Sequence, residues 1–163
     1  MSDLSVTDLK QILLFTMGEP RYALNLSVVE RVVQAVEIIP LPKAPPLVLG
    51  VINVQGEIIP VVDIRECFGM AAREITLSDQ FILARTSKRR VAVVADAVSG
   101  IHELTDGQLV TAGEVLPGAE FIRGVAKLDD TLVLICDLDQ ILSLETEQVL
   151  DATLAEAPAA EAA

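Results

Sequence analysis

A repeated strand–turn–strand pattern constrains the fold of this chain more than any other feature. Residues 49–63 contain two aliphatic arms, one ending at Val54 and the other starting at Ile58, with a polar turn around Gly56 between them. This pattern predicts a β-hairpin, and arms that are almost entirely aliphatic indicate strands buried on both faces. Pro60 lacks a backbone N–H, so we expect it to lie at a sheet edge or at a bulge.

The same pattern returns at residues 123–137. Gly50 and Gly124 are 74 apart in the numbering, and so are Asp63 and Asp137. An aspartate before a short helical segment is a favoured N-terminal cap, because its carboxylate accepts a backbone N–H of the first turn. Each copy is therefore predicted to form a strand–turn–strand–helix unit.

The repeat extends to the hairpin that precedes each copy. Residues 11–26 and 80–95 each predict two strands joined by a short turn, and corresponding residues lie 69 apart. The sequence therefore predicts a duplicated, mainly β architecture with about five strands in each half. The two pseudo-repeats are expected over about residues 10–70 and 80–144.

The segment between the first two hairpins carries two further local signals. Ser27 is the expected cap of a short helix at residues 28–32, in which Val29 and Val32 would share a face. Residues 40–46 contain four prolines, which exclude regular structure there because proline lacks the N–H that helices and strands need. We expect this segment to deliver the chain to the central hairpin.

The length of 163 residues suits one domain, or two small halves that share a core. We place this domain at residues 9–150. Residues 145–156 predict an acidic amphipathic helix. An acidic, alanine-rich tail is expected at residues 151–163, where the last residues would fray.

Composition and charge exclude several classes of function. Hydrophobic residues make up 52% of the chain and aromatic residues 3%, which is typical of an aliphatic core and excludes a disordered chain. The net charge of −12 argues against binding to nucleic acid or to an anionic membrane surface. The first residues resemble no secretory signal, and two cysteines form no disulfide framework, so we expect a cytoplasmic protein.

No pattern in the sequence indicates catalysis. His102 is the only histidine, and no spacing of cysteine and histidine suits a metal. Phosphate-binding glycine loops and nucleophile motifs are also missing. The interpretation of Asp63 and Asp137 as helix caps, and of Glu57 as a turn residue, accounts for the carboxylates. We therefore expect a protein-binding module without enzymatic activity, cofactor or metal.

The second hairpin has a basic run, Lys88–Arg89–Arg90, at its expected turn. Three charged residues are ordinary at a solvated hairpin tip, which is the interpretation we prefer. A docking patch is the alternative.

Taken together, these motifs resemble the CheW-type chemotaxis coupling proteins. The resemblance covers about residues 11–144. The matching positions are residues 15–18, 22–24, 29, 32, 39–42, 50–53, 56, 59–65, 68–69, 94–98, 124–125 and 137–138. The string from Gly50 to Asp63 is its most specific part.

The resemblance implies two small five-stranded, SH3-like β-barrels packed on a common hydrophobic core. It implies a non-enzymatic adaptor that binds the regulatory domain of the histidine kinase CheA and the cytoplasmic tip of chemoreceptors. Such a protein would be cytoplasmic and held at membrane-associated receptor arrays by its partners. Two alternatives are an adaptor of a related pathway, such as surface motility, and a β-barrel that binds a small ligand.

The resemblance also implies which residues bind these partners. Two of them depart from the family pattern: Arg31 stands where the family often has glutamate, and Gln55 stands where it usually has arginine. A glutamate lies one residue before the first of these positions, at Glu30. We expect both departures to alter the choice of partner. The predicted protein-binding residues are Val29, Arg31, Val32, Gly50, Asn53, Gln55 and Gly56.

Overall fold

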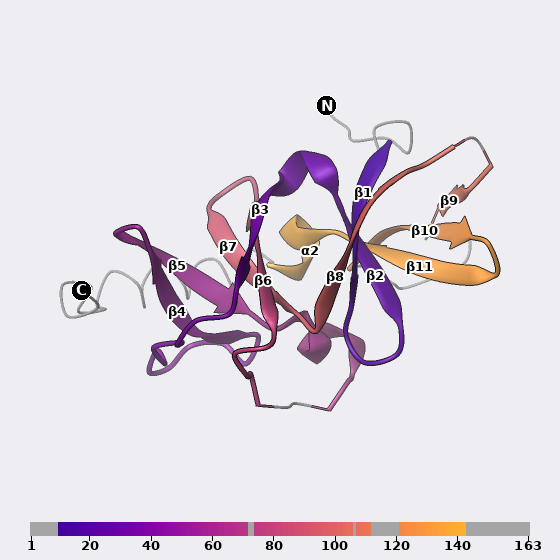
Figure 1. Ribbon diagram of the computed structural model, residues 1–163. Helices are drawn as coiled ribbons and strands as arrows, with labels where there is room; N and C mark the ends of the chain where they lie inside the picture. The colour runs from indigo at the N-terminus through magenta and orange to yellow at the C-terminus, as the bar shows by residue number, and fades with distance from the viewer. Residues whose placement is uncertain (1–9, 72–73, 106, 112–120, 143–163) are drawn as a thin grey trace. The chain divides into compact units, whose positions relative to one another are not determined.

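The protein, in a computed structural model, is described at residues 10–71, 74–105, 107–111 and 121–142, and these residues form a mainly β structure (Figure 1). It divides into two compact units, each built on one sheet. The predicted C-terminal helix lies outside the described residues. Among the described residues, no helix has the length and apolar character needed to cross a membrane.

The first compact unit, unit 1, contains residues 10–29 and the described residues of 95–141. Its sheet has six strands in the order β8–β1–β2–β11–β10–β9. The strands are β1 (Gln11–Thr16), β2 (Arg21–Asn25), β8 (Ala97–Glu103), β9 (Leu109–Thr111), β10 (Ile122–Leu128) and β11 (Thr131–Cys136). A short helix, α2 (Leu138–Ile141), follows the last strand. Its core cluster comprises Ile12, Leu14, Ala23, Ala126, Leu128, Val133 and Ile135.

The second compact unit, unit 2, contains the described residues of 30–94, together with Leu142. Its sheet has five strands in the order β3–β6–β7–β5–β4. The strands are β3 (Val29–Gln34), β4 (Val48–Val54), β5 (Glu57–Val62), β6 (Gln80–Arg85) and β7 (Arg90–Ala95). A 3-10 helix, η3 (Ile64–Phe68), follows β5. Its core cluster comprises Ala35, Ile52, Ile59, Val61, Phe81, Leu83, Ala92 and Val94.

The two units repeat the same strand pairing residue by residue. In unit 2, β5 runs parallel to β7 with Val61 opposite Ala92. In unit 1, β11 runs parallel to β2 with Ile135 opposite Ala23. Val61 and Ile135 are 74 apart, and Ala23 and Ala92 are 69 apart, which are the two intervals of the sequence repeat. The predicted pseudo-repeated β architecture is therefore confirmed. Each unit nevertheless takes strands from both pseudo-repeats, whose boundaries and common core stay a prediction.

The sixth strand of unit 1 has a shortened counterpart in unit 2. In unit 1, Val110 of β9 pairs with Val125 of β10. In unit 2, Val51 of β4, which corresponds to Val125 in the repeat, forms a single bridge with Ile39. The proline-rich segment that follows β3 is therefore held against β4 by one pair of residues.

The central hairpin forms where its sequence predicts it, but its turn is shorter, because Glu57, expected in the turn, is the first residue of β5. Gln55 and Gly56 join β4 to β5 with φ angles of 52° and 89°, which defines a two-residue turn of the type that favours glycine. Asn53 supports it, because its Oδ1 accepts the backbone N–H of Gly56 at 2.8 Å. Pro60 precedes Val61, the first residue through which β5 pairs with β7, so its missing N–H costs no bond on that side.

The predicted helix that Ser27 would cap is wrong. A 3-10 helix, η2 (Leu26–Val28), occupies only the start of this segment, and its cap is Asn25, whose Oδ1 accepts the N–H of Ser27 at 3.1 Å. Strand β3 begins at Val29, because a valine-rich segment is stable as an extended strand when another strand pairs with it. Val29 and Val32 therefore lie on opposite faces, since side chains alternate along a strand.

Candidate protein-binding site

The predicted binding residues fall into two groups, which belong to unit 2 except for Val29, the last residue of unit 1 before β3 continues into unit 2. The first group lies on β3, at one end of the strand order, and the second lies on β4 and its turn, at the other end. Three strands separate β3 from β4 in the strand order. Arg90 of β7 nevertheless links the two groups, because it bonds both Glu30 of β3 and Glu57, which directly follows Gly56. The β3 group is Val29, Arg31 and Val32, and the hairpin group is Gly50, Asn53, Gln55 and Gly56.

In the β3 group, Arg31 and the neighbouring Glu30 occupy positions that are not equivalent. Arg31 is exposed, whereas Val29 and Val32 are half-buried. Glu30 and Arg31 are consecutive in a strand, so their side chains point to opposite faces. The glutamate at position 30 therefore does not take the place of a glutamate at position 31.

Glu30 instead belongs to a charged network across the strands of unit 2. Its carboxylate accepts a hydrogen bond from Arg90 Nε of β7 at 2.8 Å and lies 3.5 Å from Arg85 Nε of β6. Arg90 also donates to Glu57 of β5. The hydrogen bond to Glu30 raises the pKa of the Arg90 guanidinium above its ordinary value. The four side chains thus connect β3, β6, β7 and β5.

Gly50 has a structural role that its sequence context did not reveal. A Cβ atom at Gly50 would lie 2.3 Å from the carbonyl oxygen of Ile39, which is far inside van der Waals contact. The glycine lets Ile39 approach β4 closely enough to exchange two backbone hydrogen bonds of 2.8 Å with Val51. Gly50 therefore positions the segment around Ile39 and does not itself offer a contact surface.

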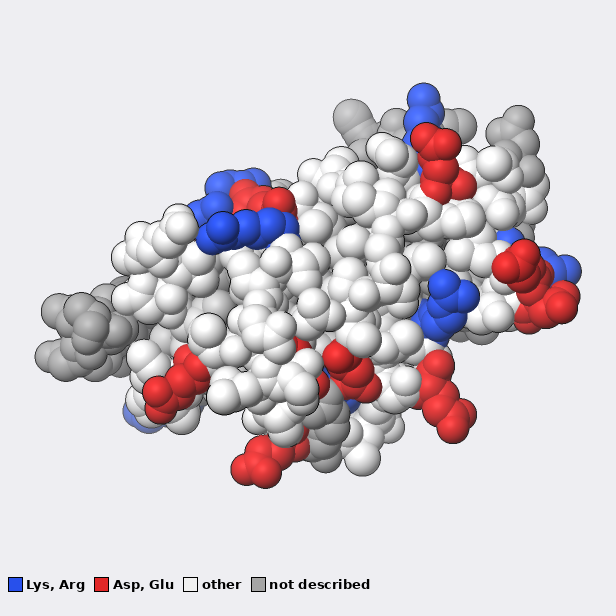
Figure 2. Space-filling view, in the orientation of Figure 1, with Lys and Arg blue, Asp and Glu red and all other residues white. Residues whose placement is uncertain are grey.

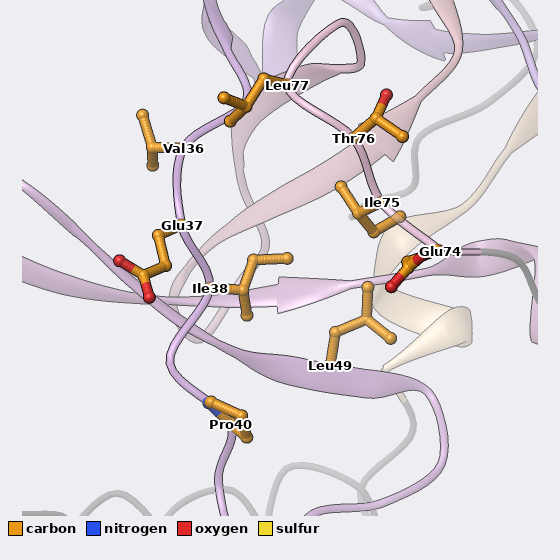
Figure 3. A pocket seen from close by; sticks show the side chains of 9 residues that line it. All are labelled: Val36, Glu37, Ile38, Pro40, Leu49, Glu74, Ile75, Thr76 and Leu77. Carbon is orange, nitrogen blue, oxygen red and sulfur yellow. The ribbon is translucent and has the colours of Figure 1, made fainter.

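An open apolar groove lies beside this segment (Figure 3). It has a volume of about 620 Å³, and residues 36–40 and 74–77 form its two walls. Ile38, Leu49 and Ile75 converge on its centre, and Leu77 lies at one end. The side chains that line it are Val36, Glu37, Ile38, Pro40, Leu49, Glu74, Ile75, Thr76 and Leu77.

The rim of this groove is unusually apolar for a protein surface. Leu77 is 70% exposed and Val36 is 46% exposed; Ile39, which lies between the lining residues Ile38 and Pro40 in the chain, is 40% exposed. Clustered exposed apolar side chains are typical of protein-interaction sites. The sequence did not predict the groove, because its walls are irregular segments without a regular spacing of hydrophobic residues. The one available signal was the apolar run before the prolines.

The described residues contain no arrangement suited to catalysis. His102 Nε2 is buried and has no hydrogen-bond partner among them. Burial, with the nearby charges of Glu66 and Asp63, raises the pKa of the Cys67 thiol to about 11, which makes it a poor nucleophile at neutral pH. In this part of the chain, no group of three or more histidine, cysteine, aspartate or glutamate side chains could hold a metal ion.

Comparison with known proteins fits this arrangement. The family model of the CheW-like domain matches residues 11–146. The chain belongs to the CheW-like family. The predicted resemblance is therefore confirmed, and with it the assignment to the chemotaxis proteins at the level of family.

Individual CheW proteins match most of the chain. The chemotaxis protein CheW of Thermotoga maritima is 31% identical over 132 residues, which cover 81% of this chain and 87% of that protein. The chemotaxis protein CheW of Rhizobium meliloti is 29% identical over 141 residues, covering 85% and 91%. The crystal structure of the scaffolding protein CheW of Thermoanaerobacter tengcongensis superposes with a TM-score of 0.76 at 28% identity, covering 84% of this chain and 94% of that one. The predicted fold of two small SH3-like β units is confirmed.

Within the CheW-like family, this chain carries its two departures on exposed positions. Arg31 lies on strand β3, and Gln55 lies in the turn after β4 with an exposed side chain. Substitutions at exposed positions leave the core clusters of unit 2 unchanged. The two residues therefore belong to the exposed surface and not to the core of unit 2.

Proposed function

We propose that this protein is a non-enzymatic adaptor that couples chemoreceptors to the histidine kinase CheA. The observation that carries the proposal is the apolar groove of unit 2, which Gly50 forms by admitting Ile39 to β4. An open apolar groove without a catalytic group beside it is suited to bind a protein surface and not to transform a small molecule. Membership in the CheW-like family supports the same function.

We assign the regulatory domain of CheA to the groove and the neighbouring β4–β5 hairpin. Leu77, Val36 and Ile39 supply exposed apolar area there, and buried apolar contact is the main source of binding energy at such surfaces. We assign the cytoplasmic tip of a chemoreceptor to the β3 face that carries Val29. The protein would then be cytoplasmic and held at receptor arrays by these partners.

Binding of the CheA regulatory domain to two matched variants tests the assignment. Leu77→Asp changes a 70% exposed leucine of the groove, and Leu132→Asp changes a 59% exposed leucine of unit 1. Loss of one buried apolar side chain costs about 1.5–3 kcal/mol, so Leu77→Asp should weaken binding by a factor of about 10 to 100. Leu132→Asp should bind like the parent protein in the same titration calorimetry experiment. Equal affinities for both variants would remove the groove from the kinase interface.

The departures at positions 31 and 55 support a second candidate, an adaptor of a related pathway such as surface motility. The more common residues at these positions are glutamate and arginine. A partner that suits Arg31 and Gln55 would carry different charges from a partner that suits those residues. Titration against the CheA regulatory domains of each pathway in the source organism separates the two candidates. Tighter binding to the kinase of the chemotaxis pathway supports the first candidate, and tighter binding to another supports the second.

A further inference from the structure

We infer that the β6–β7 turn of unit 2 is a docking surface for an acidic segment of another protein. The surface consists of Arg85, Lys88, Arg89 and Arg90, which we call the basic platform. It is independent of the apolar groove and of the kinase and receptor assignments. Figure 2 shows Lys and Arg side chains gathered at the upper left of this face, with acidic side chains between them, over the end of the β6–β7 hairpin.

The concentration of charge is the first observation. The chain has 12 Lys and Arg residues against 24 Asp and Glu, yet four of the 12 lie within residues 85–90. Glu30 and Glu57 are the carboxylates that pair with Arg85 and Arg90 of this platform. An acidic protein with a net charge of −12 needs no cations for solubility, and these four reduce the charge that keeps it soluble.

The turn is also held in one conformation. Thr86 is buried, and its hydroxyl accepts the backbone N–H groups of Lys88 and Arg89, both at 3.1 Å. The same hydroxyl donates to the carbonyl of Arg89 at 3.0 Å, and the N–H of Thr86 donates to that carbonyl at 2.8 Å. A turn fixed in this way presents its basic side chains without a further loss of backbone entropy on binding.

The matching turn of unit 1 shows that the fold does not require basic residues here. Glu19, in the turn between β1 and β2, corresponds to Lys88 in the repeat. The N–H of Gly18 donates to the carboxylate of Asp96 at 2.6 Å, so this turn is closed by an acidic side chain. Residues 16–21 of the unit 1 hairpin contain one glutamate and one arginine, whereas residues 85–90 contain four cations. The charge of the basic platform is therefore not required by the hairpin.

The ion pairs of the network order part of the platform. Arg90 is held between Glu30 and Glu57, whereas the Arg85 side chain is 60% exposed and lies 3.5 Å from Glu30. Arg85 is therefore available to a further carboxylate while Arg90 remains fixed. Lys88 is exposed at the end of the turn.

The overall charge selects a short acidic protein segment over an extended polyanion. Charges interact over about 8 Å at physiological ionic strength, so a short segment bound at the turn meets mainly the platform. Nucleic acid or an anionic membrane presents charge over a much larger area and would also meet the acidic remainder of a chain of net charge −12. The segment recognised should therefore have several glutamates or aspartates in succession.

Titration of the full chain, labelled with nitrogen-15, with a peptide of six glutamates tests this inference. The amide signals of Lys88 and Arg89 should shift on titration, and the shifts should vanish when the salt is raised from about 0.05 M to about 0.5 M. Lys88→Glu with Arg89→Glu should weaken binding about tenfold or more, because attraction becomes repulsion. Lys88→Gln with Arg89→Gln should weaken peptide binding by less than the charge reversal. This variant replaces the charge reversal in the test if the reversal unfolds the turn.

Lys10→Glu with Lys127→Glu is the matched control, since it makes the same change of net charge at exposed positions of unit 1. This control should bind the peptide within about twofold of the parent chain, because it leaves all four cations of the basic platform in place and salt screens the effect of net charge. An equal loss in both double variants would show a general charge effect and overturn the inference. So would unshifted signals at residues 85–90. Tighter binding of a DNA oligonucleotide or an anionic lipid vesicle at the same residues would also overturn the assignment to a protein segment.

Discussion

Unit 1 and unit 2 share their strand pairing but differ in the side chains at matching positions. Unit 2 carries the charged network of Glu30, Arg90 and Glu57. The residues at the matching positions of unit 1 are Ser99, Arg21 and Thr131. Arg21 keeps the cation but, within the described part of the chain, has no carboxylate to pair with. The two units thus share a backbone scaffold and differ in the charged side chains that it carries.

The aspartates that follow the β4–β5 and β10–β11 hairpins, and cap the next helix, show the same difference. Asp137 Oδ1 accepts the N–H of Gln140 at 3.2 Å near the surface. Asp63 Oδ1 accepts both the backbone N–H and the guanidinium of Arg65, each at 3.1 Å, and both side chains are buried. The residue that matches Arg65 in unit 1 is Asp139. Only unit 2 therefore combines the cap with a buried ion pair.

The largest expected effect comes from removing these two caps. Asp63→Ala leaves the buried Arg65 without this carboxylate and should lower the free energy of unfolding by about 3 kcal/mol. Asp137→Ala removes only a surface cap and should cost about 1 kcal/mol. Urea unfolding of both variants measures the difference, with Asp63→Asn as a control that keeps the cap acceptor. Equal changes would show that the ion pair with Arg65 adds nothing to the cap.

Two glycines of the central hairpin share a positive φ and differ in how closely other atoms approach them. Gly50 has a φ of 154°, and Gly50→Ala also forces Cβ against the carbonyl of Ile39, so the overpacking should cost about 1–3 kcal/mol. Gly56→Ala meets no atom within 4 Å and should cost about 1 kcal/mol, through its φ of 89° alone. Hydrogen exchange sharpens the distinction. Only Gly50→Ala should speed exchange at the N–H groups of Ile39 and Val51, and unchanged rates there would contradict the role given to Gly50.

The smallest expected effect concerns the departures at positions 31 and 55. Arg31→Glu with Gln55→Arg should change the ratio of affinities for two different CheA regulatory domains by a factor of about 2 to 10, because exposed charge pairs contribute little. Lys10→Glu with Gln11→Arg makes the same exchange on unit 1 and should leave the ratio unchanged. If the first double variant also left the ratio unchanged, these positions would not determine specificity.

Local sequence signals predicted the central hairpin and the caps Asp63 and Asp137, because each depends on a few adjacent residues, whereas the predicted cap Ser27 was wrong. Asn53 and Gly56 specify the central turn, and Asp63 specifies the cap that follows. Strand β3 was missed because its partner β6 lies far along the chain, beyond the central hairpin. A pattern of valines three apart fits a helix as well as a strand until that partner is known.

The site depended still more on distant residues. Arg90 joins Glu30, 60 residues away, and Glu57, 33 residues away, so no local pattern could reveal the network. The family resemblance supplied Gly50 as a binding residue, but only the structure shows that this glycine acts on Ile39. The apolar groove likewise combines two irregular segments that are separate in the sequence.

Hydrogen exchange of the complex with the CheA regulatory domain tests the central claim most directly. If unit 2 carries the binding surface on a duplicated scaffold, binding should slow exchange at residues 36–40, at residues 74–77 and in the turn at Gln55 and Gly56. The matching turn of unit 1, at Asp129 and Asp130, should exchange as in the free protein. Protection confined to unit 1, with the groove of unit 2 unchanged, would contradict the account.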